Sequence, residues 1–185
     1  RTVPADADGI CNALADPRVW EFLVMNAQTA EQWHETIAAL QTAPAFCQWT
    51  VVLREEVNGL PAGTIVGTTA FLDTSAQDAR TEIGFTSYNP LVWGTRVNPE
   101  TKLLLLRWAF DRMLMGRVQL KTDVRNVRSQ KAISRLGATY EGVRRRYQRR
   151  ADGSIRDTVV FSIIAQEWPA VRDGLIQRLG GDPQA

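Results

Sequence analysis

The chain has few of the residues from which metal centres, disulfide frameworks and hydrolytic triads are built. Its 185 residues include two cysteines, Cys11 and Cys47, and one histidine, His34. The cysteines fit no metal-ligand spacing, so we expect two buried thiols rather than a disulfide or a nucleophile. One histidine without clustered thiols argues against a zinc site and against a Ser/His/Asp triad. We therefore expect no metal, and we expect His34 on the surface of an amphipathic helix.

Long apolar runs and a strong net charge are also absent. No run approaches the length of a membrane span and no charged-then-apolar leader opens the chain, so we expect a cytoplasmic protein with no membrane partner. The net charge of +2 is too small to argue for nucleic acid by itself. A hydrophobic fraction of 44% is ordinary for a globular domain with a real core. Because the chain begins at Arg1 rather than Met, we expect native residues to precede it.

The most informative stretch that is present covers residues 93–115. A glycine turn at Gly94 leads into Asn98, a favoured N-cap, and then into Pro99, whose fixed φ suits the first helical position. Apolar residues on more than one side predict a central helix covered by other elements, with Gly116 as a left-handed stop. The free N–H groups at such a helix start form an anion site suited to phosphate. An ordinary, well-capped helix is the alternative.

The rest of the pattern predicts a mixed sheet flanked by helices. We expect helices at 8–15, 19–25, 30–41, 127–136 and 167–179, and strands at 46–56, 64–72, 80–88, 117–123, 140–150 and 155–165. The strand at 117–123 can lie parallel to the strand at 80–88 through a right-handed crossover over the central helix. This predicts an α/β fold whose sheet is mostly antiparallel with one parallel βαβ unit, in a single domain at 1–179 with a disordered tail at 180–185.

Four motifs in this order resemble those of the GNAT-fold N-acetyltransferases, and in particular the Rim-type ribosomal-protein N-terminal acetyltransferases. They are Glu82-Ile-Gly-Phe, Asn89-Pro90 with Trp93-Gly94, Asn126-Val-Arg-Ser129 with Arg135-Leu-Gly137, and Glu141-Gly142 leading to Asp152-Gly153 and Arg156-Asp157. Each motif alone is weak but the four together are fairly specific, and the resemblance covers nearly the whole chain from the first helices to Trp168. The resemblance implies a GNAT fold, acetyl coenzyme A (acetyl-CoA) as the acetyl donor and a primary amine as the acceptor.

The resemblance also implies which residues bind the donor. Its pyrophosphate would lie on the loop Gly94, Thr95, Arg96, Val97 and Asn98. The family loop reads Arg/Gln-x-x-Gly-x-Gly/Ala, whereas Trp93, Arg96 and Asn98 stand at the corresponding positions here, so Gly94 is the only glycine in the loop. Backbone N–H groups do the binding in such a loop, so we expect binding to survive at reduced affinity.

In the same family the pantetheine arm lies where the strand ending at Tyr88 diverges from the strand starting at Arg117. Thr86 and Tyr88 occupy the positions whose backbone pairs with the arm, and Asn126 matches an asparagine whose amide binds it. Arg128 and Lys131 lie on one helical face and could reach a phosphate of the donor. The alternatives are that Asn126 is a simple N-cap and that Arg128 belongs to a solvated basic face.

Glu82 and Ser129 are the candidate catalytic residues that the resemblance implies. Strand alternation predicts that Glu82, Gly84, Thr86 and Tyr88 share one face, with space for an acyl group beside the carboxylate at Gly84. Glu82 is a candidate base for the acceptor ammonium; pairing with an arginine is the structural alternative. Ser129 is the candidate acid for the leaving thiolate, because Ile133 stands where many members carry a tyrosine; helix packing is its alternative role.

The run Arg144-Arg-Arg-Tyr-Gln-Arg-Arg150 is the strongest charge feature. Alternation predicts Arg144, Arg146, Gln148 and Arg150 on one face and Arg145, Tyr147 and Arg149 on the other. An acidic substrate, a donor phosphate, ribosomal RNA and a solvated strand edge all suit it. The function that we expect from the resemblance is direct transfer of acetyl to a peptide N-terminus or a small amine in a ternary complex. Two alternative hypotheses stay open: a catalytically silent GNAT module that binds RNA or another anion, and acetylation of an antibiotic or nucleotide-linked amine. Oligomeric state, including a homodimer, is also open.

Overall fold

A twisted sheet with the strand order β1-β2-β3-β4-β6-β5 organises the part of the chain that the computed structural model describes, residues 1–25, 27–150 and 152–183. The strands are β1 (Cys47–Val52), β2 (Ile65–Ser75), β3 (Arg80–Tyr88), β4 (Arg117–Asp123), β5 (Thr139–Arg149) and β6 (Ile155–Ile164). The helices are α1 (Ala7–Ala13), α2 (Ala30–Thr42), α3 (Val97–Arg107), α4 (Val127–Ser134) and α5 (Trp168–Leu179). The β3–β4 pair is parallel and the other named pairs are antiparallel, which confirms the predicted fold class.

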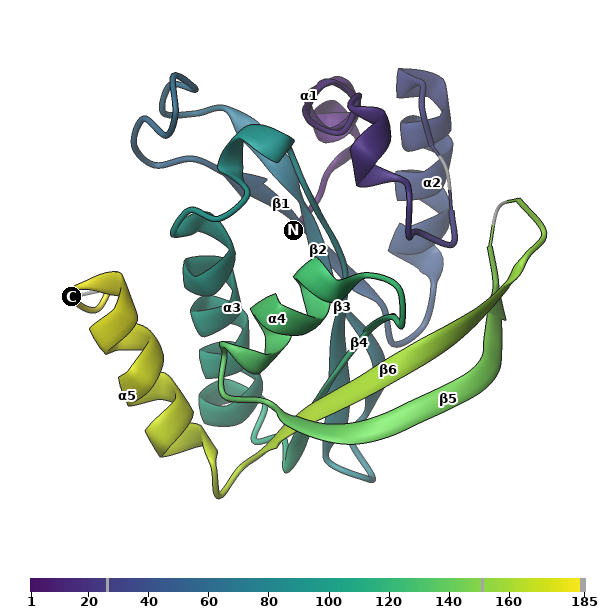
Figure 1. The fold of residues 1–185 in the computed structure, drawn as a ribbon. Helices are drawn as coiled ribbons and strands as arrows, with labels where there is room; N and C mark the ends of the chain where they lie inside the picture. Colours follow the sequence, from purple (N-terminus) through teal and green to yellow (C-terminus); the bar gives the residue numbers. More distant parts are fainter. Residues whose placement is uncertain (26, 151, 184–185) are drawn as a thin grey trace.

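Helices cover both faces of the sheet (Figure 1). Helices α1 and α2 pack on one face around a cluster that includes Ile10, Trp33 and Ile37. Helices α3, α4 and α5 pack on the other face, where their apolar side chains meet Ile83, Leu120 and residues of β6. Helix α3 is buried on several sides, as predicted, because it is the crossover between the two parallel strands.

Three helix predictions are wrong. The predicted helix at 19–25 is absent: a 3-10 helix at Pro17–Val19 includes only the first of these residues, and turns and irregular structure follow it. Helix α3 begins at Val97, so Asn98 is not its N-cap; the hydroxyl of Thr95 accepts from the Val97 N–H at 3.3 Å instead. The left-handed residue after the helix is Leu114, with φ 55°, rather than Gly116. A π-helical turn at Trp108–Arg112 follows α3 and moves the stop upstream.

A bulge in β3 changes the face on which its side chains lie. Ala70 pairs with Gly84 and Thr68 with Ser87, so β3 carries one extra residue there, and Phe85 has φ 51°. After the bulge the alternation is inverted. The predicted common face is therefore wrong: Glu82 lies on the α1/α2 face, whereas Thr86 points toward α3.

A second bulge interrupts β5. Arg144 pairs with Thr158 and Gln148 with Arg156, and Arg146 between them has φ 51° with its N–H on Asp157 Oδ1 at 2.6 Å. The two predicted faces of the basic run are wrong as a result, because Arg144 and Tyr147 meet on one face. The long hairpin β5–β6 bends away from the sheet and curves upward on the α2 side in Figure 1.

The chain ends on α5 and a short segment. Gly180 ends α5 in the left-handed conformation with φ 77°. Asp182, within the predicted tail, forms an ion pair with Arg107 at 2.7 Å, while residues 184–185 lie outside the described residues. In the described ranges, no helix has both the length and the apolar character needed to cross a membrane. Cys11 and Cys47 are free, half-buried thiols, and His34 is exposed on α2.

Candidate active site

The parallel strands β3 and β4 diverge soon after they begin to pair. Their pairing joins Arg80–Glu82 to Arg117–Gln119 and ends there, although β3 continues to Tyr88. A cavity of about 520 Å³ occupies this region. Its lining includes side chains from both faces of the sheet, among them Glu82 and Lys121 from the α1/α2 side and Lys102 and Asn98 from the α3 side. The cavity therefore crosses the sheet through the gap between the strands.

The loop before α3 lines one end of this cavity with Gly94 and Asn98. Gly94 has φ 77°, a conformation that glycine adopts without strain. In the described part of the chain, no group accepts a hydrogen bond from the amides of Gly94, Arg96 or Asn98. The Arg96 side chain is shared between Glu55 and Glu100, each at 3.2 Å, so its charge is already partly neutralised. The loop offers a phosphate mainly backbone N–H groups and the positive end of the helix dipole.

Trp93, at the first position of this loop, holds two neighbours in place. Its indole N–H donates to the carbonyl of Tyr88 at 3.0 Å. The guanidinium of Arg128, from the start of α4, stacks on its ring at 3.4 Å from the ring centroid. Arg128 therefore lies beside the loop, although its side chain remains exposed to solvent. The Tyr88 side chain is buried, and burial raises the pKa of its phenol.

Asn126 and Ser129 line the cavity at the start of α4. Asn126 is the N-cap, because its Oδ1 accepts from the Ser129 N–H at 2.9 Å. The described residues offer no partner to the Asn126 amide NH2, nor to the Ser129 hydroxyl. Capping and ligand binding are thus compatible at Asn126. Ile133, one turn along the helix, is buried against the core.

Glu82 lies at the other side of the gap and is almost fully buried, with 6% of its surface exposed. Its Oε2 forms an ion pair with Lys121 Nζ at 2.7 Å and accepts from Gln119 Nε2 at 3.1 Å. The partner is thus a lysine and not the arginine of the structural alternative. Oε1 has no partner among the described residues, and a Cβ added at Gly84 would lie 3.1 Å from it. The same Cβ would lie 2.5 Å from Leu72 Cδ1, so glycine at that position allows Leu72 to pack beside the carboxylate.

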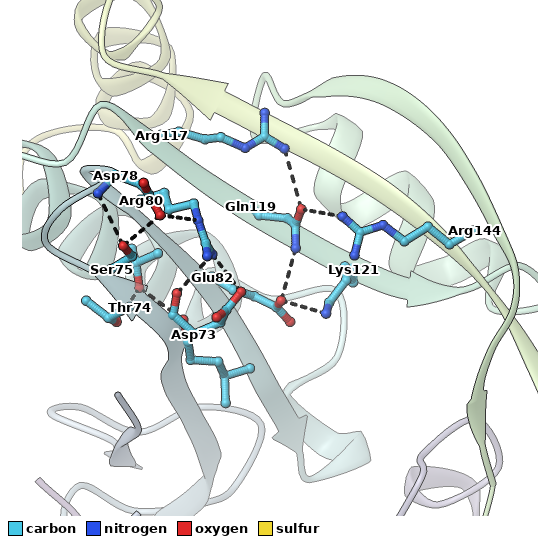
Figure 2. A network of polar contacts seen from close by, with 12 residues as sticks. Asp73, Thr74, Ser75, Asp78, Arg80, Glu82, Arg117, Gln119, Lys121 and Arg144 are labelled. Atoms are coloured by element: carbon cyan, nitrogen blue, oxygen red, sulfur yellow. Dashed lines mark hydrogen bonds and ion pairs between the residues drawn. The ribbon is translucent and has the colours of Figure 1, made fainter. Parts of the chain in front are cut away.

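Figure 2 shows how Gln119 is oriented toward Glu82. Its Oε1 accepts from Arg117 at 3.5 Å and from Arg144 at 3.4 Å, which leaves its NH2 group to donate to the carboxylate. Arg117 is itself held by a bidentate ion pair with Glu141. This pair lowers the pKa of Glu141 to about 2. Arg117 and Arg144 thus orient the Gln119 amide so that its NH2 group faces Glu82. Lys121 holds the same carboxylate oxygen of Glu82 by an ion pair.

Lys102 lines the cavity from α3, and sequence reasoning missed it. It is 4% exposed and donates to Thr86 Oγ1 at 2.5 Å and to Thr69 Oγ1 at 3.2 Å, with no carboxylate partner in the described ranges. Burial lowers its pKa to about 7. A signal was present: Pro99, Lys102, Leu106 and Ala109 follow the three-four spacing of an inward helix stripe, and all four are buried.

Tyr147 and Arg156 also line the cavity and received no site role from the sequence. The Tyr147 hydroxyl accepts from Arg144 at 3.0 Å, and Lys121 lies over its ring at 5.0 Å from the centroid. Arg156, on β6, is buried with 8% exposed, and its Nε has no hydrogen-bond partner. No group of three or more His, Cys, Asp or Glu side chains that could hold a metal occurs in the residues that the structure describes.

Comparison with known proteins identifies the class to which this fold and cavity belong. Residues 1–139 match the family model described as the acetyltransferase (GNAT) domain. The chain therefore belongs to the GNAT acetyltransferase family, whose members use acetyl-CoA as the acetyl donor.

Individual relatives agree with this membership. A T. thermophilus protein assigned to the acetyltransferases is 34% identical, with a TM-score of 0.84 over 96% of this chain and 90% of that one. The N-acetyltransferase p20 of Bacillus licheniformis is 24% identical over 88% of this chain and 89% of its own length. Mycobacterium smegmatis RimJ, solved with CoA-disulfide, shares the fold at 18% identity and a TM-score of 0.79, covering 97% of this chain and 87% of RimJ. Ribosomal-protein-S5-alanine acetyltransferase from Vibrio fischeri also shares the fold, with 19% identity and a TM-score of 0.71. The match covers 91% of this chain and 93% of that protein.

Proposed function

We propose that the protein transfers acetyl from acetyl-CoA to a primary amine by direct attack in a ternary complex, in the cytoplasm. The observation that carries the proposal is the cavity between β3 and β4, which joins the amide-rich loop at Gly94–Asn98 to the free Oε1 of Glu82. A donor bound at one end and an amine bound at the other would meet in the gap between the strands. The acceptor is a protein N-terminus or a small amine.

The donor's phosphates bind the amides of Gly94, Arg96 and Asn98, with Arg128 adding a cation held by Trp93. Arg96 and Asn98 replace both glycines of the family pattern, but the amides of Gly94, Arg96 and Asn98 have no acceptor in the described part of the chain, which supports binding. The arm of the donor lies along β3 beyond Glu82, where the backbone has no partner strand on the β4 side. The Asn126 amide then faces the arm from α4.

In the reaction, Glu82 Oε1 removes a proton from the acceptor ammonium, while Gln119 and Lys121 hold Oε2. The neutral amine attacks the thioester carbonyl, a C–N bond forms and the C–S bond breaks. Backbone N–H groups near the β3 bulge stabilise the oxygen charge. The leaving thiolate takes its proton from Ser129 Oγ, whose hydroxyl lines the cavity, and the proton that the new amide nitrogen loses restores the serine hydroxyl.

The rival reading, a silent module that binds RNA through the basic hairpin, has less support. Arg144 contacts Tyr147 and Gln119, Arg149 donates to the Gly153 carbonyl and Arg150 pairs with Asp123. Asp123 neutralises the charge of Arg150, and the hydrogen bonds of Arg144 and Arg149 hold their side chains against neighbouring groups instead of extending them toward RNA phosphates. Salt-sensitive RNA binding without acetyl transfer would favour the rival.

Isothermal titration with acetyl-CoA is the first test of the proposal. We expect micromolar affinity, and we expect Arg128→Ala to weaken it by about ten-fold, because one charge-assisted phosphate contact is lost. Lys131→Ala, an exposed lysine of the same helix that does not line the cavity, is the matched control and should bind like the wild type. No detectable binding to the wild type would refute the enzyme proposal.

The assignment of Glu82 is tested by Glu82→Gln in an assay of CoA release with a primary-amine peptide. We expect kcat/KM to fall by about 100-fold or more and the rise of rate with pH that reports the base to be lost. Glu35→Gln, at an exposed site on α2, should leave rate and pH profile unchanged. An unaltered pH–rate profile in Glu82→Gln would remove Glu82 as the base.

A further inference from the structure

Arg156 is a buried cation that forms no ion pair within the described chain. Its side chain lines the cavity on the α1/α2 face, is 8% exposed, and its Nε–H donates to no acceptor among the described residues. Burial lowers the pKa of the guanidinium, which nevertheless remains charged at neutral pH because arginine titrates so high. A buried charge without an ion-pair partner is unfavourable, and such a group in a cavity is a candidate for binding a ligand of opposite charge.

The nearby carboxylates are already engaged. Asp123 is fully buried and accepts from Arg150 Nε at 2.9 Å, with Arg125 at 3.4 Å on its other oxygen. Glu82 is paired with Lys121 at 2.7 Å. Asp123 and Glu82 act on Arg156 only at a distance, and each is in contact with other cations, so positive charge is in excess at this end of the cavity.

The excess charge does not lie where the donor's phosphates are expected. Those phosphates belong at the loop before α3, beside Gly94 and Asn98, whereas Arg156 is on β6 with Gln148 of β5 as its strand neighbour. Apolar residues of the loop Phe22–Met25 line the cavity as well. The acceptor end therefore combines a free carboxylate oxygen on Glu82, an apolar wall and an unpaired guanidinium.

We propose that Arg156 binds an anionic group of the acceptor, so that the substrate is a primary amine that also carries a carboxylate. In this arrangement the ammonium lies at Glu82 Oε1, the carboxylate forms a charge-assisted pair with the Arg156 guanidinium, and the connecting carbons lie along the apolar wall. This deepens the proposed function and rests on it. The carboxylate can belong to a small amino acid or to an acidic side chain near a peptide N-terminus.

The test compares amines that differ only in this charge. CoA release is measured with γ-aminobutyrate and its amide, and with peptides beginning Ala-Glu and Ala-Gln, which separates the small-molecule source from the peptide source. We expect the carboxylate member of one pair to have a kcat/KM about ten-fold higher or more in the wild type, and we expect Arg156→Gln to abolish this preference mainly by raising KM. Arg156→Lys should retain part of it. Arg145→Gln, an exposed arginine of the same hairpin, should retain all of it.

A second measurement does not depend on turnover. Glutarate should raise the Tm of the wild type and of Arg145→Gln but not of Arg156→Gln, and the uncharged glutaramide should raise none of them. Equal preference for acid and amide in the wild type, or an unchanged effect of glutarate on Arg156→Gln, would overturn the proposal. Acetyl-CoA binding by titration is unaffected by either result, so failure of this inference is distinguishable from failure of the proposed function.

Discussion

Replacement of Lys102 by methionine should stabilise the fold and change how its stability depends on pH. Methionine has a similar length, and the hydroxyls of Thr69 and Thr86 lie 2.9 Å apart, so they keep each other as partners when the ammonium is removed. The substitution therefore removes a buried charge without leaving a buried polar group unpaired.

The magnitude follows from the pKa of Lys102. Burial lowers it from 10.5 to about 7 in the folded protein, a difference that corresponds to about 5 kcal/mol. The unfolded chain holds the proton up to its higher pKa, so the wild type gains stability as pH rises from 7 toward 10.5 and bears the full penalty below 7. With about 1 kcal/mol lost for each of the two hydrogen bonds, Lys102→Met should be about 3 kcal/mol more stable than wild type at pH 6.

Urea denaturation at about pH 6 and about pH 9 measures the effect. The advantage of Lys102→Met should shrink by about 2–3 kcal/mol between these values, because the wild type loses most of its penalty there. Other titrating groups are shared by both proteins and cancel. Lys131→Met, at an exposed site, should match the wild type at both values. A less stable Lys102→Met, or the same pH dependence as wild type, would refute the reasoning.

Two further predictions concern an ion pair and a glycine. Asp123→Asn should destabilise the fold by about 3–5 kcal/mol in urea denaturation, because Arg150 is left buried without its partner, and Asp123→Asn with Arg150→Met should recover most of the loss; an additive loss in the double variant would contradict this. Gly94→Ala should lower the free energy of unfolding by about 1 kcal/mol, because Gly94 has φ 77°. Gly116→Ala should be neutral or slightly stabilising in the same urea denaturation, because φ is not positive there and the new Cβ would lie 3.5 Å from its nearest neighbour. Equal effects at the two glycines would contradict the difference in their backbone conformations.

The regular elements could be predicted because their patterns are strong and local. Strands at 80–88 and 117–123 agree with β3 and β4 residue for residue, and the antiparallel hairpins and the crossover follow from the order of elements. The start of α3 was predicted late because Asn98 and Pro99 resemble a cap and a first helical residue. In the structure the Thr95 hydroxyl receives the first free N–H instead.

The sequence pointed to many of the residues that line the cavity, but not to how their side chains are arranged around it. Alternation assumes a regular strand, and neither Phe85 nor Arg146 is a residue type that marks a positive φ. The pairing of Glu82 with Lys121 depends on the register between β3 and β4, which no local pattern contains. Arg156 could be read as part of a motif, but that it is buried and lacks a partner depends on how β6 packs.

The bulge at Phe85 explains how one strand can serve both sides of the cavity. Glu82 and Thr86 are four residues apart, so in a regular strand they would share a face, and Lys102 on α3 would then be buried without the Thr86 hydroxyl. The extra residue turns Thr86 toward α3 while Glu82 stays on the α1/α2 face. Because β3 has parted from β4 over the same residues, the sheet is open where the face changes. The backbone of β3, more than any single side chain, therefore connects the amide-rich loop before α3 to the carboxylate and the unpaired arginine on the other face.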